Sequence, residues 1–172
     1  RILLAVEDRE NALHMHTWLT AHPFKNPVAV TILSVVPSLA MVEPHLMVGF
    51  KGWSEEQNRQ AQQVVKDTAQ ALAGPQFTVT TDVRMGDPAA TVCEVGNSYD
   101  LIVVSSHGRK GLDRFLLGSV SHGIVHRAGR SVLVDEASSE DERGRAVDQV
   151  WQGNLAVLDH EQRVVVQPHF DR

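Results

Sequence analysis

The chain has 172 residues, of which 42% are hydrophobic and 22% charged, which fits one ordinary globular domain and excludes a disordered chain. The formal net charge of -5 argues against nonspecific nucleic-acid binding, and no apolar run reaches the roughly 18 residues of a transmembrane helix. The single cysteine, Cys93, excludes an intrachain disulfide and predicts a reducing, cytoplasmic compartment. Because the chain opens at Arg1 directly in a predicted strand, we expect residues to precede it.

The first half of the chain predicts two strand–helix units. Residues 2–6 are an apolar strand, and residues 11–22 carry apolar side chains at helical spacing. Residues 28–36 are β-branched and apolar enough for a second buried strand. Residues 37–53 are poorly patterned and predict a loop. Ser54 and Gln57 resemble a capping box that starts a long helix, which Gly74-Pro75 ends.

The second half continues the alternation. Residues 77–84 alternate between apolar and polar side chains, which predicts a half-exposed strand at the edge of the sheet. Asp87 and Pro88 are typical of an N-cap and a first helical residue, and Ala89, Val92 and Cys93 are expected to face inward on that short helix. A strand at 101–104, a helix at 120–127 and a strand at 131–134 follow. Five strands that alternate with helices predict an α/β fold, a five-stranded parallel open sheet with helices on both faces.

The segment after the fourth strand is the richest in functional signal. It reads Ser105-Ser106-His107-Gly108, and nine residues separate Gly108 from Gly118-Ser119, where a helix begins. A strand, a glycine-bearing loop and a helix N-terminus bring free backbone N–H groups and the positive end of the helix dipole to one place. Glycine lets the backbone approach a phosphate closely. The segment therefore predicts an anion cradle, although a tight turn and a helix cap without a ligand would use the same residues.

This spacing resembles the ATP-binding signature of the universal stress protein family, G-x2-G-x9-G-[ST]. Gly108, Gly118 and Ser119 match the second glycine, the third glycine and the hydroxyl, while Ser105 replaces the first glycine. Residues 1–6 resemble the first strand of the family, and residues 126–134 its last helix and strand. The resemblance covers residues 1–135 and implies the strand order 3-2-1-4-5 of adenine nucleotide α-hydrolase-like folds. Strands one and four would then meet at the switch point, where open α/β sheets bind ligands.

The resemblance also implies a set of nucleotide-binding residues. These residues are Ala5, Val6, Glu7, Arg9, Val35, Ser105, His107, Gly108, Arg109, Gly118, Ser119, Val120 and Ser121. The family usually has aspartate, glycine and serine after its first strand, where this chain has Glu7-Asp8-Arg9. The Glu7 carboxylate would contact the base or ribose, or belong to a solvated charge cluster. Arg9 would either clamp phosphates or block the cleft by pairing with Glu7 or Asp8. The Ser105 side chain would either crowd the ribose or donate a hydrogen bond to it.

From this resemblance we expect a domain that binds ATP, with or without Mg²⁺, and acts as a sensor, regulator or scaffold in a stress response. The alternative is a domain that no longer binds nucleotide and works through protein–protein contacts. No residue has an evident role as a catalytic base, so at most slow ATP hydrolysis is expected, and the chain has no P-loop motif. His122 and His126 lie four residues apart on one predicted helix, but no further metal ligand has suitable spacing.

The last 37 residues, 136–172, lie outside the predicted domain. They read as a charged linker followed by two short apolar segments about a turn, which would form a hairpin or the start of a truncated second repeat. We expect a homodimer, because the family commonly pairs through its last strand, here residues 131–135. The extension is the alternative means of assembly.

Overall fold

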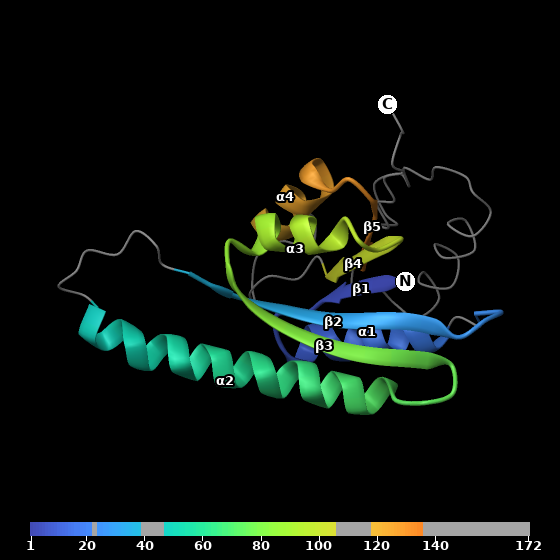
Figure 1. Cartoon of the computed structure of the whole chain (residues 1–172), viewed down its shortest axis with the longest axis horizontal. Helices are drawn as coiled ribbons and strands as arrows, with labels where there is room; N and C mark the ends of the chain where they lie inside the picture. The colour runs from blue at the N-terminus through green and yellow to red at the C-terminus, as the bar shows by residue number, and fades with distance from the viewer. Residues whose placement is uncertain (22–23, 39–46, 106–117, 136–172) are drawn as a thin grey trace.

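A computed structural model describes residues 1–21, 24–38, 47–105 and 118–135 of the chain (Figure 1). Strands and helices alternate throughout, as the sequence predicts. In chain order they are β1 (Ile2–Ala5), α1 (Arg9–Ala21), β2 (Val28–Pro37), α2 (Met47–Leu72), β3 (Phe77–Gly86), α3 (Pro88–Gly96), β4 (Leu101–Ser105), α4 (Ser119–Arg127) and β5 (Ser131–Asp135). No helix in these ranges is both long and apolar enough to cross a membrane.

The five strands form one parallel sheet in the order β3-β2-β1-β4-β5, which confirms the predicted topology. β1 lies at the centre, where Ile2 pairs with Val30 of β2 on one side and with Leu101 of β4 on the other. The chain reaches β2 and β3 on one side of β1 before it crosses to β4 and β5 on the other. The switch point therefore lies between the carboxyl ends of β1 and β4.

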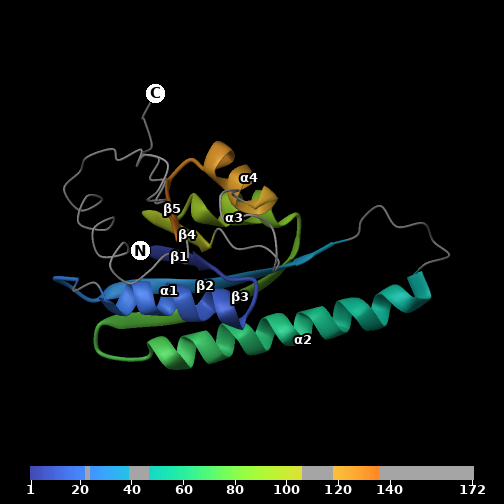
Figure 2. The same ribbon diagram turned by 180° about the vertical axis from the view of Figure 1, so that it is seen from behind.

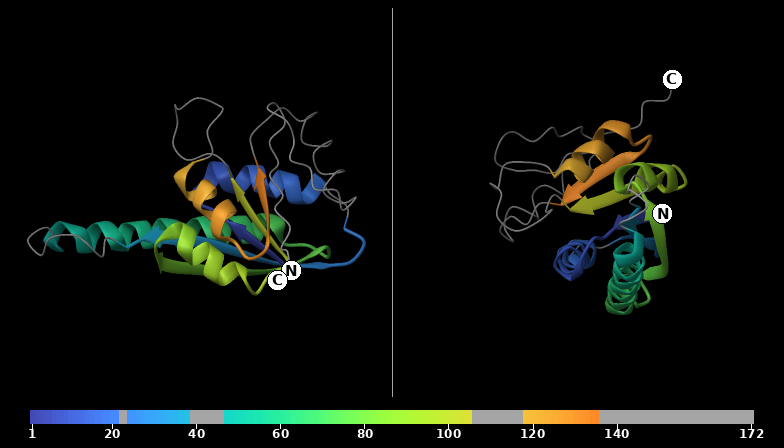
Figure 3. Two further views of the ribbon diagram at one scale, coloured as in Figure 1. Left: turned by 90° about the horizontal axis from the view of Figure 1, so that it is seen from above. Right: turned by 90° about the vertical axis from the view of Figure 1, so that its left-hand side faces the viewer.

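The helices cover both faces of the sheet. α1 and α2 lie on one face and α3 and α4 on the other, as the right-hand view of Figure 3 shows. Alternate residues of β1 point to opposite faces, so Leu4 packs against Met15 and Leu19 of α1, while Leu3 packs with Val92 of α3 and Ile124 of α4. Because β1 and β4 are buried on both faces, β1 and residues 101–104 of β4 are apolar without interruption, as in other parallel sheets, while β2 also carries Thr31 and Ser34.

The start of α3 confirms the predicted cap. The Asp87 side chain accepts a hydrogen bond of 2.8 Å from the backbone N–H of Ala90, and Pro88 occupies the first turn, where its missing N–H costs nothing. Ala89 and Val92 are buried as expected, and Cys93 is half-buried beside them.

The predicted start of the long helix was wrong. α2 begins at Met47 within the segment predicted as a loop, so Ser54 and Gln57 lie inside a helix of 26 residues and form no capping box. Buried side chains first appear at Ala61, and none of residues 52–60 is buried. The first half of α2 stands clear of the sheet (Figures 1 and 2). Residues 52–60 are mostly polar and carry no buried apolar stripe that would have revealed the helix.

Candidate functional site

The candidate site lies at the switch point, where β1 ends at Ala5 and β4 ends at Ser105. After β1 the chain stays tied to β2, because the Val6 N–H donates a hydrogen bond of 2.9 Å to the Leu33 carbonyl oxygen. α1 and α4 both begin at this end of the sheet. Two strand ends and two helix N-termini therefore converge there.

A short chain of hydrogen bonds joins these elements. The Ser105 hydroxyl donates to Oδ1 of Asn11 in the first turn of α1 over 3.1 Å. The Ser121 hydroxyl, in the first turn of α4, donates to the Ser105 carbonyl oxygen, also over 3.1 Å. Asn11 and Ser121 are only 4% and 5% exposed. Buried hydrogen bonds of this kind hold their elements in a fixed arrangement, so the ends of β4, α1 and α4 are locked together.

Sequence reasoning missed Asn11. Its backbone N–H donates to Oδ1 of Asp8 over 2.9 Å, and the Ala12 N–H donates to the Asp8 carbonyl oxygen over 3.0 Å. Asp8 is thus the N-cap of α1 and not merely part of a solvated charge cluster, and the helix begins at Arg9 instead of residue 11. The available signal was Asp8 itself, because aspartate is a favoured N-cap residue and this one closely follows the first predicted strand.

The N-terminus of α4 is the feature expected to hold phosphate. Gly118 is its N-cap, with φ -56° and ψ 153°, and has no side chain with which to satisfy the first N–H groups of the helix. Ser119 and Val120 are exposed, whereas Ser121 is buried. This end of α4 therefore offers backbone donors and a positive dipole to an anion.

The other predicted site residues divide into three groups. Ala5 and Val35 are half-buried at the carboxyl ends of β1 and β2, and both pack on the face that α3 and α4 cover, the same face as the α4 N-terminus. Val6 is buried in the opposite face, and Glu7 is exposed. The predicted residues His107, Gly108 and Arg109 lie outside the described residues.

The Arg9 side chain lies beside α2. Its guanidinium group forms an ion pair of 3.1 Å with Oδ2 of Asp67, in the C-terminal part of α2. The other carboxylate oxygen of Asp67 accepts a hydrogen bond of 2.6 Å from Gln63. The blocking interpretation named Glu7 or Asp8 as the partner of Arg9, and this pair corrects it. Because α2 covers the face opposite α4, the Arg9 side chain points away from the α4 N-terminus.

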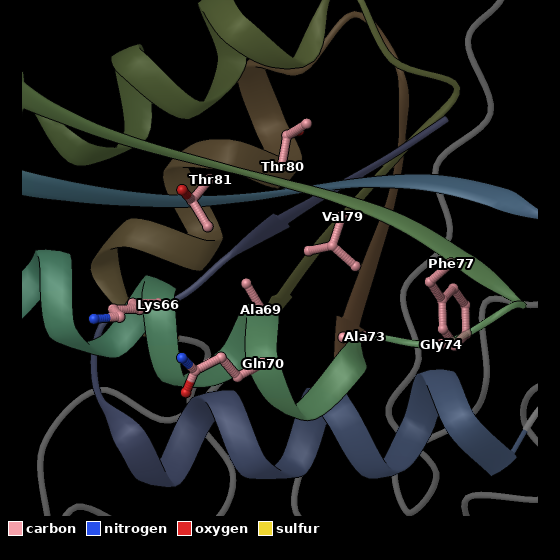
Figure 4. Close-up of a pocket in the computed structure, with 9 residues that line it drawn as sticks. All are labelled: Lys66, Ala69, Gln70, Ala73, Gly74, Phe77, Val79, Thr80 and Thr81. Atoms are coloured by element: carbon pink, nitrogen blue, oxygen red, sulfur yellow. The ribbon is translucent and has the colours of Figure 1, made fainter.

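A groove lies at a different part of the molecule, between α2 and the edge strand β3 (Figure 4). Its lining combines apolar and polar side chains. The lining residues are Lys66, Ala69, Gln70, Ala73, Gly74, Phe77, Val79, Thr80 and Thr81. β3 is separated from β4 by two strands, so this groove is not the switch-point cleft.

Two further groups were considered from the sequence. The His122 and His126 rings lie edge to face with centroids 4.3 Å apart, and no cluster of three or more His, Cys, Asp or Glu side chains occurs among the residues the structure describes. Burial raises the pKa of the Cys93 thiol, and this effect outweighs the opposing charge of Arg127. The Cys93 thiol donates a weak hydrogen bond to the Ile124 carbonyl oxygen at 3.8 Å, which fits a structural role in the packing of α3 on α4.

This chain belongs to the universal stress protein family, whose family model matches residues 1–135. A universal stress protein of Mycobacterium tuberculosis is 37% identical over 84 residues, which cover 48% of this chain and 28% of that protein. One from Mycolicibacterium smegmatis is 28% identical over 151 residues, or 83% of this chain and 51% of its own. The match to these relatives thus spans about half of their length or less.

Solved structures show the same fold. Universal stress protein UspA from Lactobacillus plantarum superposes with a TM-score of 0.64 at 21% identity, covering 77% of this chain and 94% of its own. An Arabidopsis thaliana universal stress protein family protein, solved with AMP bound, superposes with a TM-score of 0.54 at 15% identity, covering 82% and 94%. These likenesses establish a Rossmann-like α/β sheet.

Proposed function

We propose that this domain binds an adenine nucleotide, ATP, in the cleft between the carboxyl ends of β1 and β4. The observation that carries the proposal is the hydrogen-bonded link from Asn11 through Ser105 to Ser121. It fixes the α4 N-terminus beside the switch point, and a fixed set of backbone donors binds an anion without first having to be ordered. The bound AMP of the Arabidopsis relative supports the same ligand class.

In this proposal the phosphates lie at the N-terminus of α4, on the backbone N–H groups of Ser119, Val120 and Ser121. Gly118 allows close approach, and Gly108, His107 and Arg109 complete the signature loop. The base and sugar occupy the ends of β1 and β2, in contact with Ala5, Val6, Glu7 and Val35. The Ser105 hydroxyl donates to Asn11, so its contribution on the sugar side is steric.

The proposed role is regulatory. A sensor or scaffold in a stress response uses the occupancy of the nucleotide site, with or without Mg²⁺, to change its contacts with a partner. No described side chain at the cleft is placed to activate a water molecule, so we propose no more than slow hydrolysis. The single half-buried thiol fits a cytoplasmic setting as part of the same proposal. A homodimer through β5 or through residues 136–172 remains a prediction.

Two observations favour a second function. The chain has Ser105 in place of the first signature glycine, and its only described cation near the β1 end, Arg9, is occupied by Asp67. Both features favour a domain that has lost nucleotide binding and acts through protein contacts.

Isothermal titration of the full chain with ATP, ADP, AMP and GTP, each with and without Mg²⁺, separates the two functions. Mass spectrometry of the nucleotides released from the purified protein is the independent measurement. Saturable binding of adenine nucleotides in preference to GTP is expected. If no nucleotide binds and none is released, the second function stands.

A further inference from the structure

The outer edge of β3 is long and lacks most of the usual protection of an edge strand. β3 pairs with β2 in unbroken register over ten residues, from Phe77 to Gly86, and the described residues place no strand on its other side. Natural edges are blunted by charged side chains, by proline, by bulges or by shortness. The sequence of β3 contains no proline, its ladder has no bulge, and its two charged side chains, Asp82 and Arg84, pair with each other. Such an edge is a template for a further strand.

The backbone groups available on this edge can be identified. The Val28 N–H bonds to the Gln76 carbonyl oxygen and the Ser38 N–H to that of Gly86, so even-numbered carbonyls point toward β2. Backbone groups alternate in direction along a strand. Those of Val79, Thr81, Val83 and Met85 therefore face outward, away from β2.

The charges on β3 are arranged to complement their own copy. Asp82 and Arg84 lie on one face of the strand on either side of Val83, and their side chains pair at 2.8 Å. In an antiparallel pair of β3 strands that places Val83 opposite Val83 of the second copy, Asp82 lies opposite Arg84 twice. These are the positions without backbone hydrogen bonds, where opposed side chains approach most closely. Centring the pair on Asp82 or on Arg84 would instead oppose like charges.

The same register would cover apolar surface. It places Thr81 opposite Met85, whose side chain is 56% exposed. In this register residues 80–86 of the two strands face one another, so the groove of Figure 4, which reaches Phe77 and Val79, lies beside the paired segment and is not covered by it.

We propose that two copies of this chain associate through antiparallel pairing of their β3 edges, centred on Val83. This surface is distinct from the β5 edge at the other side of the sheet. In β5 the side chains of Val132, Leu133 and Val134 are at most 1% exposed, whereas most of β3 is exposed or half-buried. Pairing at β3 also brings the two α2 helices together side by side, since each α2 packs on β2 and β3. Residues 52–60 of α2, none of which is buried, then lie along the partner's helix.

The test is sedimentation equilibrium of the full chain over a micromolar concentration series. Asp82→Arg opposes arginine to arginine at both positions and is expected to weaken the dimer about tenfold, as Arg84→Asp is for two opposed carboxylates. The double variant Asp82→Arg/Arg84→Asp restores opposite charges and is expected to return the dissociation constant to within about twofold of wild type. Circular dichroism of each variant shows whether the monomer is folded.

A backbone variant tests the edge without changing charge. Thr81→Pro removes an outward N–H that takes no part in the ladder with β2, so it is expected to weaken the dimer, with Thr81→Ala as its matched control. The proposal is overturned if the wild-type chain is monomeric throughout. It is equally overturned if both single charge reversals leave the dissociation constant unchanged, because the dimer then uses another surface, such as β5 or residues 136–172.

Discussion

The hydroxyl of Ser105 donates a hydrogen bond of 3.1 Å to the buried side chain of Asn11, across 94 positions of sequence. Ser105 stands where the family signature has glycine, so a residue that departs from the pattern is also the one that ties β4 to α1. In this chain Ser105 therefore stabilises the contact between β4 and α1 at the switch point.

Replacement of Ser105 with glycine should separate these two roles. Ser105→Gly removes a partly buried hydrogen bond and is expected to lower the free energy of unfolding by about 1 kcal/mol, measured by urea denaturation. It also removes a side chain from the sugar side of the cleft, so the ATP affinity is expected to be unchanged or stronger. Asn11→Ala is the control, because it removes the same bond and leaves the Ser105 side chain in place. A marked loss of ATP affinity in Ser105→Gly alone would show that the hydroxyl contacts the nucleotide.

Gly118 offers the most direct test of the phosphate cradle. Its φ of -56° is accessible to every residue, so Gly118→Val needs no backbone rearrangement and should keep the fold. The added side chain would stand over the first N–H groups of α4, and ATP binding is expected to be lost in isothermal titration. Gly52→Ala is a matched control, because a methyl group there meets no atom within 4 Å. Wild-type affinity in Gly118→Val would remove the α4 N-terminus from the site.

Much of the fold could be predicted because its signals are local. The apolar runs of β1, β2 and β4, the alternation in β3 and the Asp87-Pro88 cap each lie within a few residues of sequence, and the order of elements then limits the topology. The start of α2 could not be predicted in the same way. None of residues 52–60 is buried, so the sequence carries no buried stripe there.

The site was predictable only in part, for a related reason. Gly118 and Ser119 are recognisable from spacing along the chain. The partners of Ser105 and Arg9, by contrast, are Asn11 and Asp67, which the fold brings close from distant parts of the sequence. Nothing in the residues near Arg9 indicates which carboxylate it meets.

Cys93 is expected to react slowly with alkylating reagents in the folded protein. Burial raises the pKa of its thiol, so the reactive thiolate is scarcer at neutral pH than in an unfolded chain. The alkylation rate should rise as the pH increases beyond the ordinary thiol value of about 8.5. Arg127 lowers this pKa, so Arg127→Ala should slow alkylation further. Iodoacetamide labelling followed by mass spectrometry measures the rate, with the urea-unfolded chain as reference. Equal rates in the folded and unfolded chains would contradict this assignment.

If Arg9 contributes to the nucleotide site, replacement of Arg9 and replacement of Asp67 should change the ATP affinity in opposite directions. A free guanidinium group that meets a phosphate contributes roughly 1.5–3 kcal/mol, but here it must first leave Asp67. Arg9→Ala is therefore expected to weaken ATP binding by less than this range, about tenfold or less. Asp67→Asn weakens the competing pair and is expected to strengthen binding, and this gain should vanish in the double variant.

The stability of the same variants provides the control. Arg9 is 81% exposed and Asp67 31%, so their ion pair should contribute no more than about 1 kcal/mol to folding, and the melting temperatures should stay close to that of wild type. Isothermal titration of the two single variants and the double variant completes a thermodynamic cycle. Stronger ATP binding in Arg9→Ala would mean that the arginine obstructs the cleft. If all three variants bind ATP as tightly as wild type, Arg9 only joins α1 to α2. An arginine that does not contact the nucleotide, whether paired with Asp67 or released from it, cannot change the ATP affinity.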